Sequence, residues 1–432
     1  MGGGQVSYRE SFTDWLVTDG SGQPSLPTLV DSFCRFLNAH GFAIKRCNLA
    51  SETVHPLMTS TRHVWFDQAT DAGAINPAVI VHRRQYAIGD ALIDEVFFNA
   101  GSEESPQYVA SPFYQVARRG ELYAPIGPAG AEQPFPVFHD LAAIGCTAYF
   151  GLKLESFAHM LQKIGLASTR PGGLEPERID DLRWSLKLLT LHVNTLIEYS
   201  IKNTLSRVYV GQDPGRRVCD GMVGLGAVVS MEAAIWFSDL RGFTTMSEGM
   251  TAEQLVEALN AYFDVVVGAI YAEGGEVLKY IGDAVLAIFP VHNFASADKA
   301  CEAAWAAASA SSVRLQELNA DRASRGEPPF RHGIGLHLGK AQYGNIGSRE
   351  RLDFTVIGRE VNIASRIEGM CKKLNEPVLA SGAFAERSAA AMRPLGEFPL
   401  SGVEAEVPLF TVEEAGPPAS AVANAALPSP SP

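Results

Sequence analysis

The sequence predicts an α+β protein of two domains joined by a long helix, and three observations support this fold class. Residues 231–412 alternate between strand-like and helix-like hydrophobic patterns, and residues 25–175 mix both kinds with turn clusters between them. Between the two, residues 176–213 carry a hydrophobic repeat with alternating steps of three and four. A chain of 432 residues is long enough for two or three such domains.

Composition and charge exclude several classes of function. Hydrophobic residues make up 47% of the chain and charged residues 19%, which is typical of a globular protein. The formal net charge is −13. Because nucleic acids and anionic membranes attract basic surfaces, this charge argues against nonspecific binding to either. A nucleotide substrate stays compatible with it, since metal ions can screen the phosphates.

Cysteine usage and apolar segments indicate a cytoplasmic protein. None of the six cysteines forms a CxxC pair, so we expect reduced thiols and neither a zinc site nor a disulfide framework. The N-terminus lacks the charged and apolar regions of a signal peptide. The longest apolar stretch, residues 222–237, is short and contains Glu232, so we expect no membrane span.

The first domain is expected over residues 25–175. The polar, Gly-rich residues 1–24 are predicted to be flexible. A helix is predicted over 26–40, where an apolar face ends at Gly41. Strands are expected at 78–81, 87–98 and 147–154, with loops over the Gly- and Pro-rich residues 101–136.

Residues 176–213 are predicted to form a connecting helix. Its seam consists of Ile179, Leu182, Leu186, Leu189, Val193 and Leu196, about three heptads long. We favour a parallel two-stranded coiled coil, and the alternative is an amphipathic helix packed on its own domain. Gly211 and Gly215 should end the helix, and residues 214–230 should form a short joint.

The second domain is predicted over residues 231–412. A strand at 233–238 precedes a helix that begins at the capping box of Thr251 and Gln254. Residues 276–289 are expected to form a hairpin with Asp283 at its tip. The remaining predicted elements are helices at 297–320 and 359–374, strands at 332–338, 353–357 and 377–380, and a disordered tail at 413–432.

Two carboxylates stand out in this domain. Asp239 and Asp283 each follow a strand-like run and lie at a Gly-assisted turn. Mg²⁺ usually binds one or two carboxylates together with substrate phosphates. Either residue alone is more often an ordinary turn aspartate, but the shared strand-end position of the pair favours a divalent-metal site.

Further residues fit the chemistry of a phosphate group. The turn that contains Gly242, Phe243 and Thr244 can direct consecutive N–H groups at an anion, although such turns are common. Asn362 and Arg366 lie four residues apart on one helix face and suit charge that develops on a phosphate oxygen. Without the other motifs, these two would be interpreted as an ordinary surface pair.

Lys279 precedes Asp283 by four residues. In a hairpin it lies along the arm and not at the tip. It therefore need not serve the same site as Asp283, and its ordinary alternative is a solvated strand lysine.

Taken together, these motifs make residues 231–412 resemble the catalytic domain of class III nucleotidyl cyclases. The matching segments are FSDLRGFT at 237–244, GEVLKYIGDA at 275–284, GNIG at 344–347 and FTVIGREVNIASR at 354–366. Several motifs in the right order over some 180 residues make the resemblance specific.

The resemblance implies a role for each motif residue. Asp239 and Asp283 would hold two Mg²⁺ or Mn²⁺ ions per active site, assisted by the Leu240 carbonyl. Lys279 and Thr355 would select adenine. A separate pair would act at the ribose and the transition state, namely Asn362 and Arg366.

It also implies the reaction and the assembly. The ribose 3′-hydroxyl of ATP attacks the α-phosphate and gives 3′,5′-cyclic AMP and pyrophosphate. The fold would be a ferredoxin-like βαββαβ core working as a head-to-tail homodimer. Active sites would lie at the interface, with metal residues from one protomer and base, ribose and transition-state residues from the other.

The chain departs from the family pattern at two positions. Thr355 stands where many adenylyl cyclases of the class have Asp; a subset with Thr is known, and some of its members respond to bicarbonate. Lys279, where guanylyl cyclases usually have Glu, favours adenine. Ser401 stands where many relatives place a basic residue against the triphosphate. The alternatives are a guanylyl or mixed-specificity cyclase and a non-catalytic nucleotide-binding dimerisation module.

The first domain is similar, more diffusely, to GAF-like sensor domains that precede the catalytic domain in some bacterial cyclases. The similar segments include residues 53–56, 145–149 and 169–173. His55 and His63 receive no ligand role, because isolated histidines are usually structural. An unidentified small-molecule regulator is expected to shift the dimer between two arrangements through the connecting helix.

Overall fold

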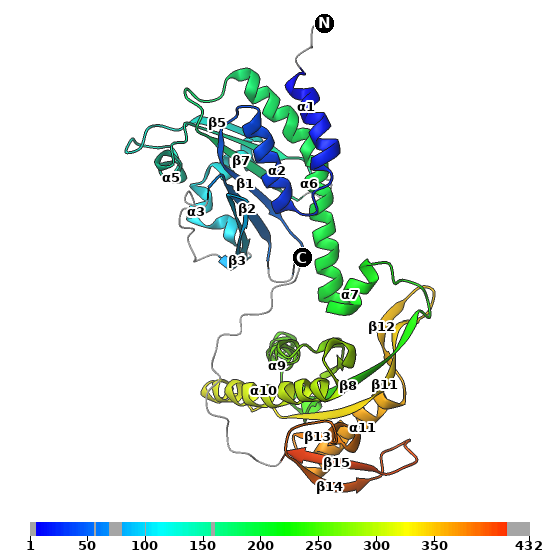
Figure 1. Cartoon of the computed structure of the whole chain (residues 1–432). Helices are drawn as coiled ribbons and strands as arrows, with labels where there is room; N and C mark the ends of the chain where they lie inside the picture. The colour runs from blue at the N-terminus through cyan, green and yellow to red at the C-terminus, as the bar shows by residue number, and fades with distance from the viewer. Residues whose placement is uncertain (1–5, 56–57, 69–79, 100, 157–159, 413–432) are drawn as a thin grey trace. The chain divides into compact units, whose positions relative to one another are not determined.

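The computed structural model describes residues 6–55, 58–68, 80–99, 101–156 and 160–412. It separates into two compact units, Met1–Leu205 and Ser206–Pro432 (Figure 1). The boundary falls within the long helix α6 (Pro176–Val210). The predicted disordered tail and part of the strand predicted at 78–81 lie outside the described residues.

The first unit is built on a seven-stranded sheet. Its strand order is β3-β4-β2-β1-β7-β6-β5, and every neighbouring pair is antiparallel. The strands are β1 (Ile44–Glu52), β2 (Ser60–Phe66), β3 (Ile80–Ile88), β4 (Ala91–Phe98), β5 (Glu121–Pro125), β6 (Ala148–Leu154) and β7 (Gln162–Ser168). The helical segments besides α6 are α1 (Tyr8–Trp15), η1 (Leu16–Gly20), α2 (Leu26–Ala39), η4 (Ser102–Glu104), α3 (Pro106–Val109), α4 (Pro112–Arg119) and α5 (Val137–Ala143).

One face of this sheet carries the main hydrophobic core. Alternate residues of β1 and β7, such as Cys47, Leu49 and Ile164, pack against α1, α2 and α6. These helices lie together on that side of the sheet (Figure 1). Side chains in a strand alternate between faces, so Arg46, Asn48 and the other intervening residues of β1 point to the opposite face.

The predicted flexible segment over residues 1–24 is wrong for residues 8–20. A capping box at Ser7 and Glu10 starts α1, and η1 follows it without a break. Phe12 and Trp15 are buried against α2 and α6. Burial of these two aromatic side chains offsets the cost of ordering a polar, Gly-rich segment.

The seam of α6 also differs from the favoured prediction. Leu182, Leu186, Leu189 and Val193 are each at most 2% exposed within the core of the first unit. A side chain that packs on its own sheet is not available to a second helix, so the coiled coil over these residues is not what the structure shows. The alternative, an amphipathic helix on its own domain, describes α6 here, and the GAF-like assignment of the unit stays a prediction.

The second unit contains the predicted βαββαβ pattern. The core elements are β8 (Val228–Leu240), α9 (Ala252–Ala272), β9 (Glu276–Ile281), β10 (Ala284–Pro290), α10 (Ala297–Ser324) and β11 (His332–Gly347). The other elements are α7 (Gln212–Cys219), α8 (Phe243–Ser247), η5 (Val291–Asn293), β12 (Leu352–Ile357), α11 (Arg359–Leu374), β13 (Val378–Ser381), α12 (Gly382–Ala385), β14 (Met392–Phe398) and β15 (Val407–Val412).

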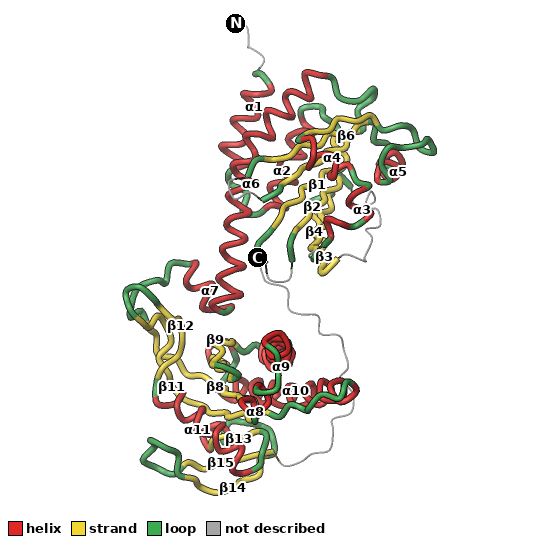
Figure 2. The backbone as a smooth tube through the Cα atoms, turned by 180° about the vertical axis from the view of Figure 1, so that it is seen from behind, coloured by secondary structure: helices red, strands yellow, loops and turns green. Residues whose placement is uncertain are grey.

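The sheet of this unit follows the order β14-β15-β13-β11-β8-β10-β9, with β12 paired to β11. The four core strands thus lie in the order β11-β8-β10-β9, which is the arrangement expected of a ferredoxin-like core. On β8, Ala234 and Trp236 pack with α9 and α10, whereas Ala233 and Ile235 face the side of α11. Figure 2 shows α9 and α10 beside each other and α11 apart from them.

Several local predictions are confirmed, and two need correction. The hairpin of β9 and β10, the capping box before α9 and the bounds of α11 are as expected. The joint predicted over 214–230 contains α7, and β8 already begins at Val228. Arg217 of α7 donates a hydrogen bond to Asp213, which Tyr343 of β11 also contacts at 2.8 Å, so this segment belongs to the folded unit.

The expectation that no stretch is long and apolar enough for a membrane span also needs correction. By length and composition, α9 meets that criterion. Tyr262, Val266 and Ile270 of this helix are fully buried against the sheet of the second unit. These contacts identify α9 as a core helix of the unit.

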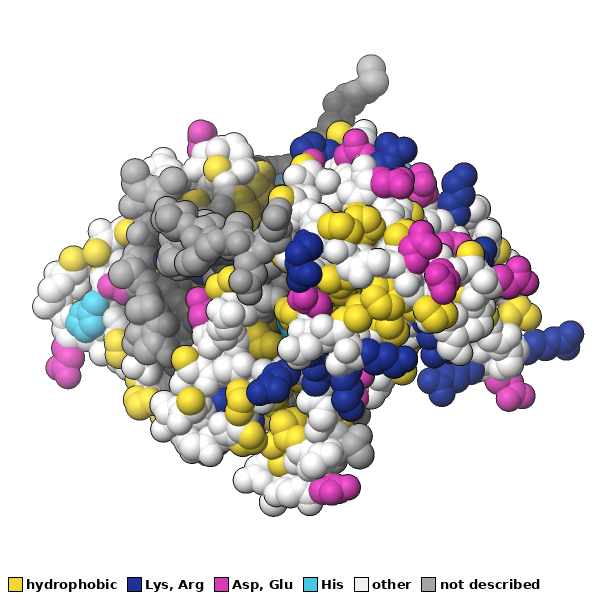
Figure 3. Space-filling view, turned by 90° about the horizontal axis from the view of Figure 1, so that it is seen from below, with side chains coloured by type: hydrophobic (Ala, Val, Ile, Leu, Met, Phe, Trp, Pro, Cys, Tyr) yellow, Lys and Arg dark blue, Asp and Glu magenta, His cyan; other side chains and the backbone are white. Residues whose placement is uncertain are grey.

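On the face that Figure 3 shows, acidic, basic and hydrophobic side chains are interspersed.

Candidate active site

Asp239 and Asp283 come together through the pairing of two strands. Asp239 is the penultimate residue of β8, and Asp283 lies in the turn between β9 and β10. The register pairs Ser238 with Val285, so the turn lies beside the end of β8. Burial first, and then the negative charge of Asp283, raises the pKa of Asp239 to about 7. The side chains of Asp239 and Asp283 also lie within hydrogen-bond reach of each other, so the two carboxyl groups are close together.

This pair fits the binding of divalent metal ions. Two half-buried carboxylates repel each other because both are negative, and a cation bound between them removes this repulsion. In the described part of the chain there is no group of three or more His, Cys, Asp or Glu side chains arranged for a metal. Mg²⁺ bound by Asp239 and Asp283 would therefore complete its shell with oxygen atoms from the backbone, water or a substrate.

A third carboxylate, Glu368 of α11, lies near the pair and was not anticipated from the sequence. Burial raises its pKa to about 7, the Arg241 guanidinium acts in the opposite direction, and Asp283 raises it further. Glu368 fits there because Gly333 and Gly335 of β11 have no side chain. A Cβ at Gly333 would lie 2.4 Å from a Glu368 carboxylate oxygen. Two glycines two residues apart in a strand were the sequence signal for this close approach.

The turn after the acidic pair has the conformation that its glycine permits. Gly242 adopts a left-handed backbone with φ of 76° and precedes α8. Phe243 packs against the hydrophobic core beneath the turn. The side chain of Thr244 lies outside the described part of the structure. The predicted phosphate contacts of Gly242, Phe243 and Thr244 stay predictions.

Lys279 of β9 and Thr355 of β12 lie on two strands that contact each other without pairing, and a residue not anticipated from the sequence joins them. Lys279 of β9 forms an ion pair with Asp353 of β12. Thr355 follows Asp353 by two residues, so the two share one side of β12. Thr355 is 4% exposed, and in the described chain its hydroxyl oxygen has no hydrogen-bond partner. An unsatisfied buried hydroxyl beside an amine is a pair of groups suited to reading a base edge.

Asn362 and Arg366 lie one turn apart on the exposed surface of α11. Among the described residues, neither side chain forms a hydrogen bond or an ion pair. Both therefore remain available to a bound molecule. Ser401 is exposed in the turn after β14 and brings no positive charge.

Exposed hydrophobic side chains flank Lys279 and Thr355. Tyr280 and Ile281 of β9 are 53% and 49% exposed, and Ile357 of β12 is 47% exposed. Ile281 follows Lys279 by two residues and Ile357 follows Thr355 by two, so each isoleucine lies on the same side of its strand as a residue expected to contact the base. Tyr280 points to the other side of β9 and packs against Phe263. Exposed apolar surface of this kind is characteristic of a protein interface.

Comparison with known proteins gives the family of this unit. Residues 228–402 match the family described as "Adenylate and Guanylate cyclase catalytic domain". The second unit is a class III nucleotidyl cyclase domain. The matched range contains all the predicted site residues discussed so far, namely Asp239, Asp283, Lys279, Thr355, Asn362 and Arg366.

Two curated relatives are adenylate cyclases by name. Adenylate cyclase 1 of Rhizobium meliloti is 35% identical over 210 residues, covering 48% of this chain and 31% of that protein. Adenylate cyclase of Anabaena cylindrica is 38% identical over 151 residues, covering 35% of this chain and 30% of that protein. The chain thus spans only about a third of the length of either relative.

Solved structures similar to the cyclase domain include enzymes named for either nucleotide. The adenylyl cyclase CyaB from P. aeruginosa is 29% identical, with a TM-score of 0.41 and coverage of 44% of this chain and 97% of that one. The guanylyl cyclase Cya2 is 30% identical, with a TM-score of 0.39 and coverage of 44% and 96%.

Proposed function

We propose that this protein is a metal-dependent adenylyl cyclase that converts ATP to 3′,5′-cyclic AMP and pyrophosphate. The observation that carries the proposal is the meeting of Asp239 and Asp283 within a cyclase domain that also retains Lys279, Asn362 and Arg366. In the reaction, the 3′-oxygen forms a bond to the α-phosphorus and loses its proton to water. The bond from the α-phosphorus to the bridging oxygen breaks, and pyrophosphate leaves.

The roles follow from what each residue offers. Two Mg²⁺ or Mn²⁺ ions at Asp239, Asp283 and the Leu240 carbonyl would lower the pKa of the attacking hydroxyl and offset charge on the leaving group. Backbone N–H groups near Gly242 would contact the phosphates. On α11, Asn362 would orient the ribose, and Arg366 would donate to the oxygens of the α-phosphate as negative charge builds on them.

Lys279 and Thr355 would select the base. A lysine ammonium donates to the ring nitrogens of adenine, whereas the corresponding edge of guanine presents an N–H group. Thr355 can donate to a ring nitrogen or accept from the adenine amino group. Because a hydroxyl serves both purposes, a guanylyl or mixed-specificity cyclase is the second candidate, and Thr355 is the observation that favours it.

We propose that the active protein is a homodimer with two equivalent sites at its interface. The exposed Ile281 and Ile357 support this arrangement, because a second copy would cover them beside the base-reading residues. The first unit would regulate the dimer in response to a small molecule. Residence in the cytoplasm belongs to the same proposal, and the six free cysteines support it.

The test is product formation by the purified full chain with ATP and GTP in parallel, with Mg²⁺ or Mn²⁺. Cyclic AMP should predominate, and Asp239→Ala and Asp283→Ala should each lower turnover by at least about a hundredfold without unfolding the protein. Glu317→Ala, which removes an exposed carboxylate of α10, is the matched control and should leave turnover unchanged. Full activity after either aspartate change would refute the assignment. Predominant cyclic GMP would establish the second candidate, and no product from either nucleotide would indicate the non-catalytic module.

A further inference from the structure

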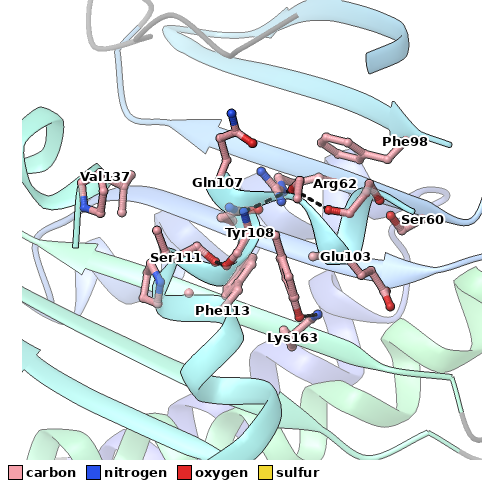
Figure 4. A pocket seen from close by; sticks show the side chains of 18 of the residues that line it. Ser60, Arg62, Phe98, Glu103, Gln107, Tyr108, Ser111, Phe113, Val137 and Lys163 are labelled. Atoms are coloured by element: carbon pink, nitrogen blue, oxygen red, sulfur yellow. Dashed lines mark hydrogen bonds between the residues drawn. The ribbon is translucent and has the colours of Figure 1, made fainter. Parts of the chain in front are cut away.

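The first unit encloses a cavity that the proposed cyclase chemistry does not use. It has a volume of about 560 Å³ and lies on the sheet face opposite α2 and α6 (Figure 4). Its floor is formed by β1, β2 and β7, and residues 102–113 cover it. A cavity of this size is in the range that holds small organic molecules.

Strand register places two cations on this floor on either side of a small residue. Ala50 of β1 pairs with Arg62 of β2 on one side and with Lys163 of β7 on the other. Paired residues on neighbouring strands point to the same face, so both cations border the space above Ala50. Arg46, four residues before Ala50 on the same strand, adds a third cation to the lining. Figure 4 shows Arg62, Lys163 and Tyr108 around the cavity.

The space between the cations exists because the floor residues are small. Gly165 of β7 lines the cavity next to Lys163, and a Cβ there would lie 2.2 Å from the Tyr149 hydroxyl oxygen. The absence of a side chain at Gly165 allows Tyr149 to lie flat across the floor. The cavity is therefore a built feature of the sheet and not a gap beneath a loop.

The hydrogen-bonding capacity of this floor is incompletely used. Within the described residues, the Nε atoms of Arg46 and Arg62 are buried without a hydrogen-bond partner, and so is Oδ1 of Asn48 between them. Neither arginine forms an ion pair there. The Arg62 guanidinium instead lies 4.8 Å from the centre of the Phe98 ring. Buried donors without acceptors are costly, so their retention points to an acceptor supplied from outside.

The acidic groups at the cavity offset the burial of the cations only in part, because the charges of Glu103 and Glu52 leave the pKa of Lys163 lowered. Glu52 accepts a hydrogen bond from the Leu161 N–H at 2.7 Å, while Glu103 and Asp140 are exposed at the edge. Lys163 donates to the Tyr108 hydroxyl at 2.7 Å, which is a neutral partner. Burial lowers the pKa of Lys163 to about 8, and burial followed by the charge of Arg46 lowers that of Arg62 to about 10. An anion bound among these cations would raise the pKa values of Lys163 and Arg62 again, because it would stabilise their charged forms.

We propose that this cavity is a binding site for a small organic anion, held through a carboxylate or phosphate group by Arg46, Arg62 and Lys163. The aromatic rings of Phe98, Phe113 and Tyr108 would contact the rest of the molecule. The proposal goes beyond the cyclase reaction, because it assigns a ligand chemistry to the other unit. It does not depend on turnover and is tested without it.

The experiment measures thermal unfolding of the metal-free full chain in citrate or inorganic phosphate, against chloride of equal ionic strength. At about 10 mM, at least one of the two anions should raise the unfolding midpoint by about 2–5 °C. Citrate alone would identify a carboxylate ligand, and phosphate alone a phosphate ligand. Arg62→Met and Lys163→Met should each reduce the shift at least threefold, whereas Arg119→Met, an exposed arginine of α4, should preserve it.

Two further variants keep the result unambiguous. Arg366→Ala in the cyclase domain should leave the shift intact, which separates this cavity from anion binding at the proposed catalytic site. Arg62→Lys retains the charge if Arg62→Met fails to fold, and it should retain part of the shift. The proposal is overturned if neither anion stabilises the protein, or if the shift survives in Arg62→Met and Lys163→Met, or if Arg366→Ala removes it.

Discussion

Asp239 and Asp283 illustrate how single residues of this chain gain their chemistry from position. Neither is unusual in its local sequence, but strand pairing brings them together with Glu368 nearby. The same holds for Lys279, which meets Asp353 across 74 positions of sequence. At this scale, the specificity of the site depends on the neighbours of the motif residues as much as on the motif residues themselves.

Asp353 offers a test of base selection. Its ion pair with Lys279 fixes where the ammonium lies, so Asp353→Asn should lower the preference for ATP over GTP by about 3–10-fold in kcat/KM. Steady-state kinetics with both nucleotides provides the measurement. Asp321→Asn removes another exposed ion-pair partner, that of Arg325, and should leave the ratio unchanged. An unaltered ratio in Asp353→Asn would show that the ion pair has no part in selection.

Lys163 should give the first unit a characteristic pH dependence. Its folded-state pKa of about 8 lies below its ordinary value of 10.5, so the unfolded chain binds this proton more tightly. The destabilisation is complete below about pH 8 and is relieved as the pH rises toward 10.5, because the folded lysine is then already neutral. Relative to Lys163→Met, the wild-type protein should therefore gain stability over this range. Unfolding midpoints of both proteins at several pH values measure the difference, and a constant difference would contradict the lowered pKa.

At the scale of elements, α6 shows how one hydrophobic pattern admits two partners. A repeat with steps of three and four places an apolar stripe along one side of a helix. This stripe can pack either against a second helix or against the sheet of its own domain. In this chain β1, β6 and β7 supply that surface, and the seam is buried there. Residues 182–197 of α6 therefore form part of the hydrophobic core of the first unit.

A matched pair of substitutions on α6 tests this packing. Leu186 is fully buried and Leu191 is 57% exposed, so Leu186→Ala should lower the free energy of unfolding of the first unit by about 2–5 kcal/mol, and Leu191→Ala by less than about 0.5 kcal/mol. Urea unfolding of the full chain followed by circular dichroism supplies both values. Similar losses for the two variants would mean that the outer face of α6 is covered as well.

At the scale of the whole molecule, the proposed function requires two copies of the chain. The acidic pair and the base-reading residues would then belong to opposite protomers at each site, as the exposed apolar residues of β9 and β12 suggest. Lys279 and Asp283 can share one hairpin under this arrangement, because each would serve a different site.

Complementation tests this assembly. Asp239→Ala and Arg366→Ala chains should each be inactive, but a mixture should recover about a quarter of wild-type activity, because random exchange makes half the dimers mixed and leaves each with one intact site. Cyclic AMP formation before and after mixing is the measurement, with subunit exchange confirmed by co-purification of differently tagged chains. Exchange without recovery would rule out sites shared between protomers.

Much of the second unit could be predicted from the sequence because its signals are local. The capping box at Thr251, the turn at Gly282 and the periodicity of α11 each depend on residues close together in the chain. The strands of the first unit were harder to predict. β1 and β2 carry Arg46 and Arg62 on the cavity face, and charged residues at such positions obscure the strand pattern.

By itself, the sequence determined the mixed α and β character of the chain, the presence of the long helix and the positions of the motif residues in the cyclase domain, since each of these depends on short-range spacing. Only the tertiary structure decided which surface buries the seam of α6, which residue pairs with Lys279, and that Arg46, Arg62 and Lys163 line one cavity. These outcomes depend on strand register and on glycine and alanine positions across strands. Such contacts join residues tens to more than a hundred positions apart, and no local pattern specifies them.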